Sequence, residues 1–207
     1  MIRAVFFDCD GVLADSEGIA NTIVAEELTA LGWAMDAHVA QHHFLGHALP
    51  DMRVVIEAEL GRPLPEGWAA RLAGRIAAEL SRGVQPMFGA AEALRDVAAS
   101  GLPMAVCSNS GRAELAMKMR VLGFGGYFGH RVFSFEDVAL PKPAPDLYLT
   151  AARACGVVPA DGLVVEDSAA GIAAGLAAGC RVVSLVGGLG VPYLAELARL
   201  ADYIRTS

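Results

Sequence analysis

Short β-branched runs alternate with helix-period segments along most of this 207-residue chain, and no other feature constrains the fold as strongly. The first run is VFF at 5–7, and it ends directly in a polar turn. Four similar runs lie within 101–110, 131–137, 162–171 and 180–188. Strands that alternate with helices are typical of a parallel sheet with helices on both faces. The sequence therefore predicts an α/β fold.

The segments between the later runs have the apolar spacing of helices. They are Ala90–Ser100, Arg112–Leu122, Pro145–Ala154 and Ser168–Ala178. Gly123, Gly156 and Gly179 closely follow the last three, as is common where helices end. The predicted architecture is a Rossmann-like parallel sheet, in which a ligand site lies beyond the carboxyl ends of the strands.

The first run and the next are about ninety residues apart, which is too long for an ordinary crossover. The intervening stretch contains four helix-period segments: Ile19–Leu31, Ala37–His43, Pro50–Leu60 and Gly67–Leu80. We interpret 16–85 as an inserted α-helical cap, and 1–15 with 86–207 as the catalytic core. An insert at this point is expected to act as a lid over the site. The alternative is that these helices belong to the main layer.

Two aspartates, Asp8 and Asp10, end the first run. Side chains alternate along a strand, so both carboxylates project the same way while the strand persists. Such a pair is suited to holding a divalent cation, or to pairing a nucleophile with an acid/base. Gly11 allows a sharp turn and the close approach of a ligand. The alternative is an ordinary polar turn at a strand end.

Polar residues also follow three later elements. Ser108 and Asn109 precede a helix, where a hydroxyl and free N–H groups can cradle a phosphate. Lys142 lies between two prolines, which suits a fixed positive charge beside a phosphoryl group. Glu166 and Asp167 end another strand and could hold a cation. Each has an ordinary alternative, namely helix capping or a solvated loop lysine.

Taken in order, these four motifs resemble those of the haloacid dehalogenase superfamily of phosphatases and phosphotransferases. DCDGVLADSE is similar to the first motif, AVCSNS to the second, PKPAPDLY to the third and VVEDSAAGIAAGLAAG to the fourth. The resemblance covers the whole chain. The insert lies where one subgroup carries a helical cap, similar to that of phosphoglycolate phosphatases and β-phosphoglucomutases.

The resemblance implies a role for each acidic residue. Asp8 would be the nucleophile that forms an aspartyl phosphate. Asp10 would protonate the leaving oxygen and then take a proton from the attacking water. Mg²⁺ would be held by the Asp8 side chain, the Asp10 backbone carbonyl and Asp167, with Glu166 close or coordinating.

The resemblance also implies how the phosphoryl group is held. Ser108 and Lys142 would bind the transferring oxygens, where negative charge must be balanced. Asn109 would orient the phosphate or Asp10.

Residues that match or differ from those of particular subgroups of this superfamily narrow the range of expected activities. Dehalogenases lack the second acid, which is present here as Asp10, and phosphonatases of this group need a cap lysine, whereas 15–90 contains none. β-Phosphoglucomutase-type mutases carry a histidine and an arginine where this chain has Ala20 and Leu49. A phosphatase is therefore preferred, with a phosphosugar mutase as the alternative. A non-catalytic binding module would be expected to lose Asp8 or Asp10.

The cap is expected to supply the substrate contacts. Its polar candidates are His42, His43, His47 and Arg53, although histidines at a solvated helix end would look the same. A small phosphorylated metabolite, either a sugar phosphate or a phosphorylated sugar acid, is the expected substrate class.

Composition limits the partners and the location. The net charge of −7 argues against nucleic acid or an anionic membrane surface, but a bound cation can still attract a phosphate. The N-terminus is not of signal-peptide type, and no apolar stretch could span a bilayer. The four scattered cysteines suit a reducing cytoplasm. The C-terminal segment predicts a short helix and an edge strand at Asp202–Ile204, and nothing in it demands an oligomeric partner.

Overall fold

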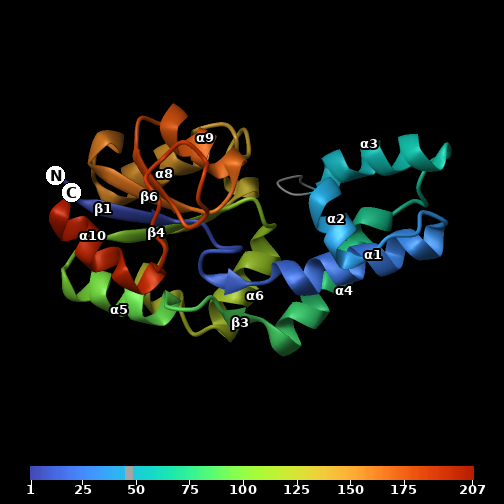
Figure 1. Ribbon diagram of the computed structural model, residues 1–207, viewed down its shortest axis with the longest axis horizontal. Coiled ribbons are helices and arrows are strands. Elements are labelled where there is room, and N and C mark those ends of the chain that lie inside the picture. Colours follow the sequence, from blue (N-terminus) through green and yellow to red (C-terminus); the bar gives the residue numbers. More distant parts are fainter. Residues whose placement is uncertain (45–48) are drawn as a thin grey trace. The chain divides into compact units, whose positions relative to one another are not determined.

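The computed structural model describes residues 1–44 and 49–207, with side chains from residue 52 onward in the second stretch (Figure 1). The chain forms two compact units. The first comprises Met1–Asp15 and Gln85–Ser207, and the second comprises Ser16–Val84. Each unit is described separately below.

The first unit is built on a parallel five-stranded sheet, which confirms the predicted α/β class. Its strands run in the order β5-β4-β1-β6-β7. In chain order they are β1 (Ala4–Phe7), β4 (Met104–Ser108), β5 (Val132–Ser134), β6 (Gly162–Glu166) and β7 (Arg181–Ser184). In the register, Phe7 lies between Val106 and Val165. This register brings the carboxyl ends of β1, β4 and β6 to one edge of the sheet, where Asp8, Ser108 and Glu166 lie.

Helices cover both faces of this sheet, with α8 and α9 on one side and α5 and α10 on the other (Figure 1). The helices of this unit are α5 (Ala90–Ala99), α6 (Arg112–Val121), α7 (Gly125–Phe128), α8 (Asp146–Cys155), α9 (Ala169–Ala177) and α10 (Leu200–Thr206). Three short 3₁₀ turns also occur: η1 (Phe135–Asp137), η2 (Pro159–Asp161) and η3 (Leu197–Arg199).

The predicted edge strand at Asp202–Ile204 is wrong, because these residues lie within α10. Leu200 is fully buried, and Arg205 pairs with Asp202 at the i,i+3 spacing of a helix. Beside β7, Ser184 already exchanges backbone hydrogen bonds with the segment 192–194. At Ser184 this segment therefore occupies the outer edge of β7, where a further strand would have paired.

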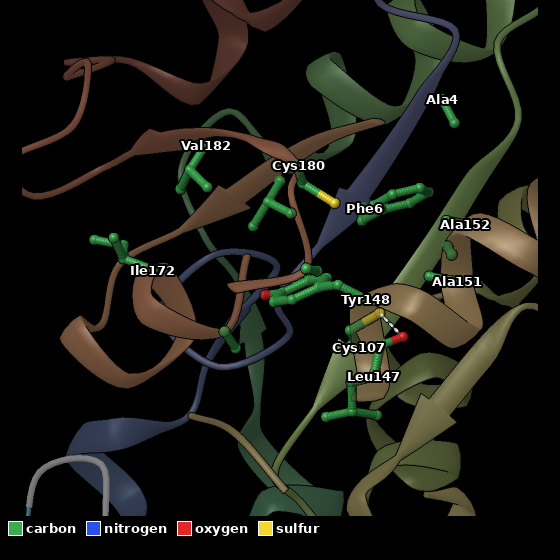
Figure 2. Packing of buried hydrophobic residues seen from close by; sticks show 14 residues of the cluster. Ala4, Phe6, Cys107, Leu147, Tyr148, Ala151, Ala152, Ile172, Cys180 and Val182 are labelled. Carbon is green, nitrogen blue, oxygen red and sulfur yellow. Dashed lines mark hydrogen bonds between the residues drawn. The ribbon is translucent and has the colours of Figure 1, made fainter. Parts of the chain in front are cut away.

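A continuous apolar core fills the space between the sheet and the helices α8 and α9. Figure 2 shows Tyr148 of α8 among buried side chains that include Phe6 and Ile172. Phe7 points to the opposite face, where its ring meets Phe128 edge to face at 6.1 Å between centroids. Because side chains alternate along β1, Asp8 follows on the same side as Phe6 and Tyr148.

In its described residues, 16–44 and 49–84, the second unit has the helices α1 (Glu17–Leu31), α2 (Ala37–Phe44), α3 (Leu49–Leu60) and α4 (Trp68–Gly83), close to the predicted segments. Its interior includes Leu28, Ile56 and Leu72, all almost completely buried. The chain leaves and re-enters the first unit through a short antiparallel pair, β2 (Ala14–Asp15) and β3 (Gln85–Pro86). That this unit serves as a lid stays a prediction.

Candidate active site

Lys142 joins the ends of two strands. Its Nζ donates to Asp8 Oδ1 at 2.6 Å and to Glu166 Oε1 at 2.6 Å. Burial opposes a charge on Lys142, but Asp8 and Glu166 outweigh it and raise the pKa of Lys142. Burial raises the pKa of Asp8 to about 7, while Lys142 acts to lower it. One buried ammonium thus faces two carboxylates, which leaves this edge of the sheet rich in negative charge.

Glu166 is completely buried at the end of β6 and is held from several sides. Its Oε1 accepts hydrogen bonds from Lys142 and from the Tyr148 hydroxyl at 2.8 Å. Its Oε2 accepts from the backbone N–H groups of Asp167 and Ser168, both at 3.1 Å, and from the Ser168 hydroxyl at 2.9 Å. Burial acts to raise its pKa, but Lys142 and the hydrogen bonds hold it below the usual range.

The crowding around Glu166 also explains a glycine. A Cβ atom on Gly171, in the first turn of α9, would overlap the Glu166 carboxylate. These donors use all the acceptor positions that a carboxylate normally offers. Glu166 is therefore placed to orient Lys142 and to close the wall of the site.

An acidic cluster suited to a cation lies beside Lys142. Carboxylate oxygens of Asp8, Glu166 and Asp167 all lie within 4.8 Å of one another. Oxygen ligands of this kind fit Mg²⁺. Gly11, with φ of +75°, makes the adjacent turn, and a Cβ there would overlap the Asp167 carboxylate. The chemistry of the donors and this close approach both fit a bound divalent cation.

Asp10 is held by residues at the end of β4 and on α6. Ser110 Oγ donates to Asp10 Oδ2 at 2.8 Å, and Ser108 Oγ lies 3.4 Å from the same oxygen. Lys118 Nζ bonds to the other oxygen, Asp10 Oδ1. Burial acts to lower the pKa of Lys118, but Asp10 and Glu114 contribute to raising it. The Asp10 side chain therefore belongs to a different set of contacts from the Asp8 carboxylate.

Asn109 binds the lysine loop. Its Nδ2 donates to the Lys142 carbonyl at 3.0 Å, and the Lys142 N–H donates to its Oδ1 at 3.0 Å. The predicted contacts of Asn109 with phosphate or Asp10 stay predictions. Ser108 is buried at the end of β4, where its hydroxyl accepts from the Ser110 N–H at 2.9 Å. Ser108 and Asn109 thus lie at the predicted edge, and Asn109 is hydrogen-bonded to the backbone of Lys142.

Sequence reasoning overlooked three residues of this site: Ser110, Lys118 and Tyr148. The scarcity of lysine could have drawn attention to one of them. The chain has only Lys118 and Lys142, and both are buried against acids of the site. Both lysines are far in sequence from Asp8 and Asp10, so only the folded sheet places them beside these aspartates.

Three of the cap candidates lie on helices of the second unit, His42 and His43 on α2 and Arg53 on α3. His42 is exposed on α2 with its ring 4.6 Å from that of His38, and His43 packs against Trp33 at 5.4 Å between ring centroids. Arg53 Nε donates to Glu57 at 2.9 Å. His47 lies outside the described residues. Their predicted contacts with substrate remain predictions.

Comparison with known proteins shows the family of this chain. A model of the haloacid dehalogenase-like hydrolase family matches residues 2–179. The chain is 31% identical over 182 residues to 6-phosphogluconate phosphatase of Escherichia coli, which covers 87% of this chain and 81% of that protein.

Solved structures show the same fold. A HAD family hydrolase from Deinococcus radiodurans, crystallised with bound phosphate and sodium, has 33% identity and a TM-score of 0.79 over 99% of this chain and 96% of that one. A haloacid dehalogenase-like protein of unknown function from Agrobacterium tumefaciens has 29% identity and a TM-score of 0.86, covering 100% and 99% of the two chains.

The chain therefore belongs to the haloacid dehalogenase-like hydrolase family. Within that family it is a phosphoric monoester hydrolase. No helix within 1–44 or 49–207 is both long and apolar enough to cross a membrane.

Proposed function

We propose that this phosphatase hydrolyses a small phosphate monoester, either a sugar phosphate or a phosphorylated sugar acid, through an aspartyl phosphate formed on Asp8. The observation that carries the proposal is the contact of Lys142 with both Asp8 and Glu166 at the edge of the sheet. Asp8 is held there on a rigid strand end, in a position suited to a nucleophile.

Asp8 attacks phosphorus, and the bond between phosphorus and the ester oxygen breaks. Lys142 remains protonated because of its acidic neighbours, so it balances negative charge on the transferring oxygens. Glu166 and Asn109 keep Lys142 in place through its ammonium and its backbone. Ser108 is the last residue of β4. Its hydroxyl and the N–H groups of the turn that follows suit phosphate oxygens.

Asp8 and Asp167 would hold Mg²⁺, together with the Asp10 backbone carbonyl. When bound, the cation offsets the repulsion between the anionic nucleophile and the anionic phosphate. Glu166 lies beside these ligands, and its role is to hold Lys142. Its two oxygens already accept five hydrogen bonds from protein donors.

Asp10 serves both halves of the reaction. It gives a proton to the departing ester oxygen and later takes one from the water that attacks the aspartyl phosphate. Its partly exposed carboxylate lies next to Ser108, the last residue of β4, and Ser110, in the turn that follows. Asp8 and Asp10 therefore divide the work of nucleophile and acid/base.

The substrate class rests on the relatives and on the cap. 6-Phosphogluconate, the substrate named for the E. coli relative, is a phosphorylated sugar acid. We infer that His42, His43, His47 and Arg53 supply contacts to the part of the substrate beyond the phosphate. A phosphorylated sugar acid is therefore the first compound to test.

The decisive experiment is phosphate release from a panel of sugar phosphates and phosphorylated sugar acids, with Mg²⁺ and with a chelator. We expect activity that needs Mg²⁺ and is lost in Asp8→Asn, while Asp96→Asn on the exposed surface of α5 retains it. Equal rates with the chelator would contradict the metal role. An isomerised sugar phosphate formed with a bisphosphate activator, in place of free phosphate, would favour the mutase.

A further inference from the structure

Lys118 is a buried cation that the proposed mechanism leaves without a task. It lies on α6 and only 1% of its surface is exposed. A buried ammonium is costly unless it is paired, and apolar residues of similar size often serve stability equally well. Its presence in a chain with only two lysines therefore directs attention to what it contacts.

Three acceptors surround the three N–H groups of Lys118. Its Nζ forms ion pairs with Asp10 Oδ1 and Glu114 Oε1, and it lies 3.1 Å from Ser110 Oγ. Ser110 in turn donates to Asp10 Oδ2 at 2.8 Å and is within 3.2 Å of Glu114 Oε1. An ammonium has three donors and no acceptor, so its capacity matches this set.

Both oxygens of Asp10 are consequently held from α6 and its preceding turn. Lys118 fixes Oδ1 and Ser110 fixes Oδ2, which together define the plane of the carboxylate. Glu114 and Lys118 lie one turn apart on the same helix, so Glu114 restrains the lysine in turn. The orientation of a proton-transfer group is thus set by a helix that contributes no acid or base of its own to the reaction.

We propose that Lys118 is a positioning residue that holds the Asp10 carboxylate in the orientation required for proton transfer to the leaving oxygen. The proposal rests on the phosphatase function proposed above. Misplacing a catalytic group by about 1 Å can cost a factor of about 100, and acid–base catalysis contributes about 100-fold to 10,000-fold. Loss of Lys118 should therefore affect esters whose leaving group needs that proton.

The test compares two substrates in Lys118→Met. 4-Nitrophenyl phosphate has a leaving group that departs without a proton, whereas the alkoxide of a sugar phosphate needs one. We expect kcat/KM to fall about 100-fold for a sugar phosphate but less than about fivefold for 4-nitrophenyl phosphate. Arg120→Met removes the same charge from an exposed position of α6, and it should leave both values unchanged.

A double variant controls for misfolding. In Lys118→Met the Glu114 carboxylate loses its ion pair with Lys118, so Glu114→Gln is added to remove that unpaired charge. The double variant should show the same difference between the two substrates. Equal losses for both substrates, or no loss for either, would overturn the positioning role. If the wild-type protein hydrolyses neither ester, the proposed function fails and this inference fails with it. Wild-type activity measured alongside separates the two results.

Discussion

Asn109 and the backbone of Lys142 exchange two hydrogen bonds of 3.0 Å, one in each direction. This pairing fixes the lysine loop to the end of β4, although the two residues are 33 positions apart. One amide side chain thus ties the loop to this strand end. The ammonium of Lys142 reaches Asp8 from that fixed loop.

Replacing Asn109 with alanine should lower activity without abolishing it. The Lys142 N–H and carbonyl would lose their partners, and each unsatisfied group costs about 1–3 kcal/mol. We expect kcat to fall about tenfold in steady-state assays, since a small displacement of a positioning group has effects of this order. An unchanged kcat would show that the loop keeps its position by other contacts.

Removing the Tyr148 hydroxyl should cost stability. In Tyr148→Phe, Glu166 loses a donor at 2.8 Å, while the ring stays packed in the core and 5.1 Å from Lys142 Nζ. Hydrogen bonds to charged groups are worth about 1.5–3 kcal/mol, so the free energy of unfolding should fall by about 2 kcal/mol. Urea unfolding measures this change. A midpoint equal to that of the wild type would mean that water replaces the hydroxyl.

Mg²⁺ should stabilise the folded protein through Asp167. A ligand that binds only the folded state adds about 2.7 kcal/mol at a hundred times its Kd. We expect Mg²⁺ to raise the Tm of the wild type, and Asp167→Asn to lose most of that rise. Glu92→Gln changes an exposed acid on α5 and should keep the rise. An equal rise in Asp167→Asn would place the cation elsewhere.

Two glycine-to-alanine changes in helices should have opposite signs. In Gly171→Ala the new Cβ overlaps the Glu166 carboxylate, and overpacking of this kind costs about 1–3 kcal/mol. In Gly74→Ala, on the exposed face of α4, nothing lies within 4 Å of the new atom. Alanine favours a helix there by about 0.5–1 kcal/mol. Thermal unfolding of both variants checks the difference, and a stabilised Gly171→Ala would contradict the crowding around Glu166.

The sequence was sufficient to predict the parallel sheet and the gathering of Asp8, Lys142 and Glu166 at one edge. These predictions depend on strand ends and loop residues, which local patterns mark well. Lys118 was overlooked because it lies in mid-helix, where a lysine usually faces solvent. Its pairing with Asp10, 108 positions away, exists only once β1 and β4 are neighbours.

Two further details of the structure, the contacts of Asn109 and the helix at Asp202–Ile204, could not be predicted for similar physical reasons. Asn109 has the sequence context of a phosphate-binding residue, and the sequence did not show that its amide also bonds to the backbone N–H and carbonyl of Lys142. Asp202–Ile204 has strand-like residues, but the segment forms helix α10, and Leu197 just before it and Leu200 at its start are buried in the core. In both cases the contacts that the residues make depend on tertiary structure, which local sequence patterns do not show.

The short pairing of β2 with β3 has a consequence for how this chain can change. Ala14 lies opposite Pro86 and Asp15 opposite Gln85, so residues 16–84 begin and end at neighbouring points. A segment with adjacent ends can be exchanged for another of different length without stretching the sheet to which it is attached. Under the proposed function, specificity for new esters would arise by replacement of that segment, while the residues proposed to handle the phosphoryl group would be inherited unchanged.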